Sequence, residues 1–168
     1  MNASENIKKI IVKKPLKLDC GKIINNYPLS YETYGDLNEK RDNAILVFHA
    51  LSGDQFVTGT NPITNKDGWW PYAVGQDKAI DTNKFFVICA NIIGGCMGSY
   101  GPSSIDPATN KAFGTNFPVI TINDMVNAQY NLLDFFNIDK LFSVTGGSMG
   151  GMQVLQFVAN YPDKTKTA

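Results

Sequence analysis

Apolar runs separated by polar, glycine-rich stretches are the main pattern of this 168-residue chain. Residues 44–50 (AILVFHA) and 84–93 (KFFVICANII) are almost continuously apolar over the length of one strand. Such runs are typical of strands buried on both faces of a sheet. A third run, 141–145, leads into a glycine-rich turn. Near the N-terminus, two β-prone stretches flank the turn-like pair Cys20-Gly21, which predicts a hairpin over residues 7–35.

Helical periodicity predicts two helices. The first spans residues 122–136, and Thr121 and Asp124 before and within it have the spacing of a capping box. The second follows Ser148 and runs to about Tyr161. The apolar face predicted for the first helix consists of Met125, Leu132 and Phe136, flanked by Val126, Ala128, Leu133 and Phe135.

Buried strands that alternate with helices indicate an α/β fold with a mostly parallel sheet. We assign the whole chain to one domain, with its α/β core over residues 43–168. Two irregular segments, 51–69 and 94–118, are long enough to suggest a functional role, and the second carries five glycines and three prolines. We expect Trp69 and Trp70 to pack at the start of a helix, with an aromatic wall for a ligand as the alternative.

Composition and charge narrow the possible functions. The 15 basic residues balance the 15 acidic ones, so no electrostatic attraction to nucleic acid is expected. No apolar run approaches membrane-spanning length, and the N-terminus has no hydrophobic signal core. Three irregularly spaced cysteines predict neither a disulfide framework nor a CxxC metal site. We therefore expect a cytoplasmic protein without a metal, a membrane partner or a nucleic-acid partner.

The stretch from Gly146 to Gly150, GGSMG, fits the pattern G-x-S-x-G between a buried strand and a helix. This is the setting of a nucleophile elbow, in which the serine backbone is strained and glycines two residues to either side avoid collisions. Ser148 is then the candidate nucleophile, and the N–H of Met149 is a candidate oxyanion donor at the helix N-terminus. The alternatives are a glycine-rich turn with a surface serine and a phosphate-binding loop, although no G-x-x-x-x-G-K-[ST] motif is present.

The stretch FHALSGD follows the first buried strand, where α/β-hydrolases place the loop with the other oxyanion donor. It contains His49, the single histidine of the chain. The base of this fold comes after the nucleophile, so we expect His49 to brace the loop rather than to act as the base. Cys96 lacks an elbow, a following helix and a histidine partner, so we interpret it as a small packing residue beside the site.

In combination these segments resemble the homoserine O-acetyltransferases, which are α/β-hydrolase-fold acyltransferases of methionine biosynthesis. The matching stretches lie in order over residues 49–163: HALSGD, GWW, the long run FFVICANIIGGCMGSYGPSSIDPATNKAFGTNFPVITINDMVNAQ, and VTGGSMGGMQVLQF followed by YPD. The resemblance implies that Ser148 attacks acetyl-CoA and passes the acetyl group to L-homoserine. It also implies backbone oxyanion donors at Leu51 and Met149, and acetyl-CoA as a co-substrate with no bound cofactor. We expect the full-length protein to be a homodimer.

The catalytic Asp and His of that family, and its helical lid, belong to a C-terminal half that these 168 residues lack. We therefore interpret the chain as the N-terminal half of a longer protein, truncated before the lid and the last strands. It should have an open apolar edge beside strand 141–145 and be nearly inactive alone. Selection of acetyl or succinyl donor, and of homoserine or serine acceptor, depends on residues beyond position 168, so homoserine O-succinyltransferase and serine O-acyltransferase stay open. Further alternatives are an α/β-hydrolase esterase, against which GGCMGSYGPSSIDP argues, and an inactive truncated chain.

Overall fold

A computed structural model describes residues 7–168; residues 1–6 of the single domain that we assigned lie outside the described part. Its main element is one six-stranded sheet. The strands are, in spatial order, β1 (Lys9–Val12), β4 (Tyr27–Tyr34), β8 (Phe86–Ala90), β5 (Ala44–Phe48), β11 (Leu141–Gly146) and β12 (Thr165–Thr167). β4 runs antiparallel to both of its neighbours, whereas β8, β5, β11 and β12 are mutually parallel. The predicted α/β class with a mostly parallel sheet is confirmed.

The two central strands, β5 and β8, are buried along their whole length. Successive residues of a strand point to opposite faces. Leu46 and Ile88 accordingly belong to one buried cluster, and Val47 belongs to a second cluster on the other face. Because both faces are covered, neither strand needs a polar side, which explains the continuous apolar runs in the sequence.

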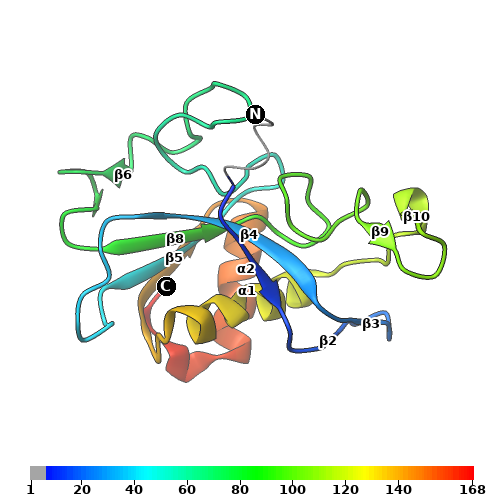
Figure 1. Cartoon of the computed structure of the whole chain (residues 1–168). Coiled ribbons are helices and arrows are strands. Elements are labelled where there is room, and N and C mark those ends of the chain that lie inside the picture. Colours follow the sequence, from blue (N-terminus) through cyan, green and yellow to red (C-terminus); the bar gives the residue numbers. More distant parts are fainter. Residues whose placement is uncertain (1–6) are drawn as a thin grey trace.

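Two helices, α1 (Ile122–Phe136) and α2 (Met149–Asn160), cover one face of the sheet (Figure 1). The predicted capping box of α1 is present: the Asp124 N–H donates to Thr121 Oγ1 over 3.2 Å, and the Thr121 N–H donates to Asp124 Oδ2 over 2.9 Å. α1 ends at Asn137, whose φ of 52° is left-handed and stops the helix. Both helices therefore begin and end within one residue of their predicted bounds.

The buried face of α1 agrees with the predicted one only in part. Met125 and Phe136 are only partly buried, and Phe135 is 49% exposed. Leu132 is buried as predicted, and so are the flanking residues Val126, Ala128 and Leu133. The residue between Val126 and Leu133 on the same helical stripe, at a spacing of three and four, is the polar Gln129. The buried stripe of α1 thus keeps the predicted aliphatic residues, excludes Phe135 and contains a buried amide.

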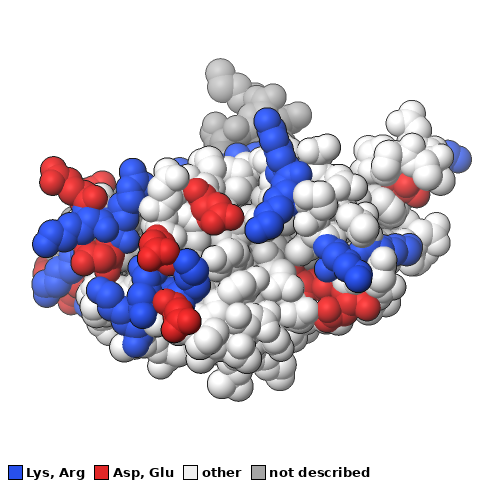
Figure 2. All heavy atoms as spheres, turned by 90° about the horizontal axis from the view of Figure 1, so that it is seen from below, with Lys and Arg blue, Asp and Glu red and all other residues white. Residues whose placement is uncertain are grey.

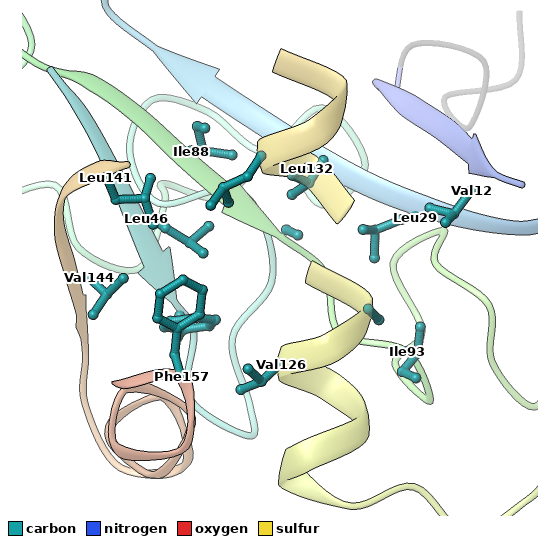
Figure 3. Packing of buried hydrophobic residues seen from close by; sticks show 14 of the residues in the cluster. Val12, Leu29, Leu46, Ile88, Ile93, Val126, Leu132, Leu141, Val144 and Phe157 are labelled. Carbon is teal, nitrogen blue, oxygen red and sulfur yellow. The ribbon is translucent and has the colours of Figure 1, made fainter. Parts of the chain in front are cut away.

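Side chains from the sheet and both helices form one core (Figure 3). Phe157 of α2 lies beside Leu46 and Val144, and its ring centroid is 5.9 Å from that of Phe48. From α1, Leu132 points toward the strands. This core fixes α2, and with it the turn that precedes α2, against the end of β5.

The opposite face of the sheet is covered by the chain that follows β5, which carries the short strands β6 (Val74–Gly75) and β7 (Ile80–Asp81) (Figure 1). The rings of Trp69 and Trp70 stack 5.6 Å apart against this buried cluster, so the predicted packing role is confirmed. The helix predicted to start there is absent. The Trp70 carbonyl accepts from the N–H groups of the third and fourth residues after it, which closes a single turn before β6.

The two N-terminal stretches pair antiparallel as β1 and β4. A smaller hairpin of β2 (Leu16–Lys17) and β3 (Ile23–Ile24) lies between them, closed where the Leu18 N–H donates to the Lys22 carbonyl. Within the segment 94–118, expected to be irregular, β9 (Ile105–Asp106) and β10 (Lys111–Ala112) form a further two-residue hairpin.

The expected open apolar edge beside β11 is wrong. After α2, a 3₁₀ turn at Pro162–Lys164 returns the chain to the sheet, and β12 pairs with β11, with Leu141 opposite Thr165. The outer strand at this edge is therefore the polar sequence Thr-Lys-Thr, of which two residues are exposed. A short polar edge strand is a poor template for further pairing.

Charged side chains of both signs lie close together toward the two sides of the face in Figure 2, with a largely uncharged area between them. This face therefore carries no large field of one sign. No helix in the described part of the chain combines the length and the low polarity that spanning a bilayer requires.

Candidate active site

The candidate site lies where the parallel strands end. Phe48 and Gly146 are paired partners in β5 and β11, so Leu51 and Ser148 follow three and two residues beyond the same position in the sheet. The chain that follows β5 covers one face of the sheet, and α2 covers the other (Figure 1). In open α/β sheets, such divergence of neighbouring connections opens a crevice at the carboxyl ends of the strands. The structure thus brings the two loops singled out in the sequence to one place.

Ser148 has the strained backbone expected of a nucleophile elbow. Its φ of 56° and ψ of −127° are those of the first central position of a type II′ turn, which favours glycine. The Gly150 N–H donates to the Gly147 carbonyl over 2.9 Å and closes this turn. A residue held in such a conformation costs about 1–3 kcal/mol and is typical of functional sites. The turn presents the serine side chain at the exposed surface, immediately before α2.

The flanking glycines are required by the neighbouring strand. A Cβ on Gly150 would lie 2.1 Å from the Phe48 carbonyl oxygen, and one on Gly146 would lie 2.6 Å from the same oxygen. The collision across the turn that we expected is present as well, because the Cβ on Gly146 would also lie 2.8 Å from the Gly150 backbone. The elbow therefore packs directly on the end of β5, which fixes Ser148 relative to the loop that contains Leu51.

Two backbone N–H groups at the site are available to an oxyanion. Among residues 7–168, neither the N–H of Leu51 nor that of Met149 donates to an acceptor. Leu51 lies in a tight turn closed by the Gly53 N–H and the Ala50 carbonyl, 2.9 Å apart, and its side chain is 77% exposed. Met149 is the first residue of α2, where N–H groups lack helical partners and the helix dipole favours negative charge. Their role as oxyanion donors stays a prediction.

The His49 ring is buried and bonded through both nitrogens. Nδ1 donates to the Ala50 carbonyl over 2.7 Å, and Nε2 accepts from the Ile92 N–H over 3.3 Å. The Asn91 side-chain amide lies 3.4 Å from Nε2. A nitrogen that accepts an N–H is unprotonated, so the ring is neutral, and burial lowers the pKa of His49 from its ordinary value. His49 thus joins the loop after β5 to the loop after β8, the bracing role that we predicted.

Asp54 organises the same loop. The Phe56 N–H donates to its Oδ1 over 2.8 Å, and the Asn61 amide donates to its Oδ2 over 3.0 Å. Burial raises the pKa of Asp54 above its ordinary value, although these hydrogen bonds and the nearby His49 act in the opposite direction. Both carboxylate oxygens are therefore engaged in holding the loop.

The glycine-rich segment after β8 is fixed through Met97. Its N–H donates to Asn91 Oδ1 over 3.1 Å, and its carbonyl accepts from Gln55 Nε2 over 3.0 Å. Cys96 beside it is exposed, so the predicted packing role is wrong. The side-chain amides on either side satisfy the backbone of this segment, and the thiol contributes nothing to a buried core.

Sequence reasoning missed two functional candidates, Gln129 and Gln153, which lie buried between the helices and the end of β5. The available signal was a polar residue at an apolar position of the helical period.

In residues 7–168, no group of three or more His, Cys, Asp or Glu side chains is arranged to hold a metal ion.

Residues 43–168 match the family model described as alpha/beta hydrolase fold, so the chain belongs to that family. Within it, the chain is 76% identical over all 168 residues to the homoserine O-acetyltransferase of Pelagibacter ubique (strain HTCC1062) and covers 45% of that protein. The homoserine O-acetyltransferase of Mesorhizobium japonicum is 58% identical over 155 residues, with 92% of this chain and 40% of that protein covered. The resemblance found in the sequence is confirmed, and the chain spans less than half the length of these relatives.

Solved structures of two activities share this architecture. The crystal structure of esterase E22 has a TM-score of 0.85 at 35% identity, over 95% of this chain and 46% of that one. Homoserine O-acetyltransferase from Bacillus anthracis has a TM-score of 0.84 at 35% identity, over 95% of this chain and 44% of that one. The shared fold thus does not by itself separate a transferase from an esterase.

Proposed function

We propose that the whole protein is a homoserine O-acetyltransferase that works through an acetyl-serine at Ser148. The observation that carries this proposal is the exposed serine on a strained elbow, in a chain 76% identical to a homoserine O-acetyltransferase. The two free N–H groups of Leu51 and Met149 beside the elbow support it, because acyl transfer develops negative charge on the carbonyl oxygen.

In the first step, Ser148 Oγ attacks the thioester carbonyl of acetyl-CoA. The new C–O bond moves charge onto the carbonyl oxygen, where the N–H groups of Leu51 and Met149 would stabilise it; one such donor is worth about 10²–10³ in rate. Collapse breaks the C–S bond and releases CoA. The homoserine hydroxyl then attacks the acetyl-serine, and Ser148 Oγ leaves. Covalent catalysis thereby divides one transfer into two similar steps.

Both steps need a base for the proton of the attacking hydroxyl. The only histidine in these 168 residues is His49, whose Nε2 accepts the Ile92 N–H and whose Nδ1 donates to a carbonyl. It has no free lone pair for Ser148, so we propose that the triad Asp and His come from chain beyond these residues.

The finer assignments rest on the family resemblance. They are acetyl-CoA and L-homoserine as small-molecule substrates, acetyl rather than succinyl as the group transferred, homoserine rather than serine as acceptor, and a homodimeric, cytoplasmic whole protein. The free cysteines Cys20, Cys89 and Cys96 are in keeping with a reducing compartment. Light scattering of the purified whole protein tests the dimer.

Hydrolysis of acetyl esters is the second candidate, favoured by the overlap with esterase E22. In that case water would take the place of homoserine in the second step. The two functions differ in their need for the acceptor.

The test is to give the whole protein acetyl-CoA with and without L-homoserine and to follow CoA, acetate and O-acetylhomoserine. A transferase releases CoA beyond the first turnover only when homoserine is present, and yields O-acetylhomoserine. Release of acetate at the same rate without homoserine would favour the hydrolase. Ser148→Ala should abolish turnover in either case, and Ser143→Ala, in β11 before the elbow, is the matched control.

A further inference from the structure

Two buried glutamine side chains lie beneath the elbow without an assigned role. Gln129 of α1 and Gln153 of α2 are both 0% exposed. Gln129 Nε2 donates to Gln153 Oε1 over 2.7 Å, which leaves the Gln153 amide nitrogen directed away from α1. That nitrogen donates to the carbonyl oxygens of His49, 3.4 Å away, and of Met149, 3.5 Å away.

Helix packing alone does not call for this pair. Buried amides cost free energy unless they are hydrogen-bonded, and apolar side chains of similar size would fill the same space. Gln129 Oε1 has no hydrogen-bond partner among residues 7–168, so the pair is not fully satisfied even in its present form. A buried unsatisfied acceptor in a native fold calls for an explanation, and pre-organisation of a site is a common one.

The two carbonyls that Gln153 contacts belong to the two sides of the candidate oxyanion hole. His49 comes directly after β5 and two residues before Leu51, whereas Met149 is itself the second donor residue. The contact lies close to the place where Gly150 packs on Phe48, since a Cβ on Gly150 would also lie 3.1 Å from the His49 carbonyl. One amide group therefore bridges the loop after β5 and the first turn of α2.

We propose that Gln153 is a positioning residue, oriented by Gln129, that sets the separation of the Leu51 and Met149 N–H groups. The inference rests on the proposed acyl transfer by Ser148. Gln153 touches no reacting atom and acts through the backbone of the two donor segments. A displacement of about 1 Å at such a site can lower the rate by about 10²-fold, so the effect should appear in catalysis more than in substrate binding.

The test compares Gln153→Met, Gln153→Glu and Gln129→Met in the whole protein with Gln156→Met. Gln156 lies on the same helix, and among the described residues its side chain bonds only to Asn160, so it is the matched control. Two readouts are the burst of p-nitrophenol from p-nitrophenyl acetate, which measures acetylation of Ser148, and the affinity for a trifluoromethyl ketone, whose adduct places an oxyanion in the hole. KM for acetyl-CoA is the third readout.

For Gln153→Met we expect burst rate and inhibitor affinity to fall together by about 10- to 100-fold, with KM within about threefold of wild type. Gln153→Glu should lose at least as much, because its carboxylate cannot donate to the two carbonyls. The proposal is overturned if the burst rate and the inhibitor affinity of Gln153→Met stay within about twofold of those of Gln156→Met. It is also overturned if KM for acetyl-CoA rises by the same factor as the burst rate falls.

Should Gln153→Met fail to fold, Gln129→Met decides, because it leaves Gln153 in place without its orienting partner; an unchanged burst rate then overturns the proposal. The burst needs no homoserine. A wild type with a burst but no O-acetylhomoserine would contradict the transferase function and leave the test of Gln153 valid. A wild type with no burst would overturn both.

Discussion

Replacing Gly150 by alanine tests whether the elbow packs directly on β5. An added Cβ would lie 2.1 Å from the Phe48 carbonyl oxygen and 2.9 Å from its carbon, whereas ordinary contacts of a Cβ lie at 3.4–4 Å. The first turn of α2 and the end of β5 must then separate by about 1.3 Å, which is 3.4 minus 2.1. Neither partner yields easily, because one is backbone of a central strand and the other a helix fixed by the core.

Overpacking of this kind costs about 1–3 kcal/mol, and a backbone oxygen as the obstacle places Gly150→Ala at the upper end. Replacing glycine by alanine inside a helix stabilises the folded state by up to about 1 kcal/mol, which offsets part of this cost. We expect a net loss of about 2 kcal/mol in the free energy of unfolding. The displacement of Ser148 should also lower acetyl transfer by about 10²-fold.

The assay is urea unfolding of the whole protein, followed by circular dichroism, beside the activity measurement. Gly151→Ala is the matched control, since its Cβ would meet only the Gly146 carbonyl at an ordinary 3.5 Å. That variant should be as stable as wild type or more so, by up to about 1 kcal/mol. A Gly150→Ala protein as stable and active as Gly151→Ala would refute the reasoning.

Three further results are expected. Ser148→Gly should abolish activity yet raise the free energy of unfolding by about 1 kcal/mol, because glycine adopts a φ of 56° without strain; a destabilised variant in thermal unfolding would argue against strain. Burial lowers the pKa of His49 below its ordinary 6.5, so below that pH the unfolded chain binds a proton that the folded protein does not. The contribution of His49 to stability should be complete above pH 6.5 and fall by up to about 1.4 kcal/mol per pH unit below it. In urea titrations between about pH 5 and about pH 7, His49→Gln should lose this fall, and equal slopes of stability against pH in the two proteins would contradict the prediction. Residues 1–168 alone should transfer acetyl at least about 10³-fold more slowly than the whole protein, because both ring nitrogens of their single histidine, His49, are engaged by backbone groups; comparable rates would show that the base lies within these residues.

Much of the fold was predictable because strong local signals agreed with it. β5 and β8 are buried on both faces, so their sequences are continuously apolar. The start of α1 was marked by its capping box. β12 could not be predicted, since three polar residues carry no periodicity and form a strand only because α2 returns the chain to β11.

The candidate site divides in the same way. Ser148 was recognisable because its elbow imposes glycines at fixed spacing. Gln129 and Gln153 were missed because a glutamine on a helix usually faces water, and only the packing of α1 on α2 buries both. The exposure of Cys96 likewise depends on how Met97 is held by residues from two loops.

The most direct test of the central claim is to trap the acyl-enzyme. The whole protein is mixed with acetyl-CoA in the absence of homoserine, quenched in acid and analysed by peptide mass spectrometry, and a second sample receives L-homoserine before the quench. We predict one acetyl group on Ser148 in the first sample and its loss, with formation of O-acetylhomoserine, in the second. No acetyl group on Ser148, or labelling that persists in Ser148→Ala, would contradict the account.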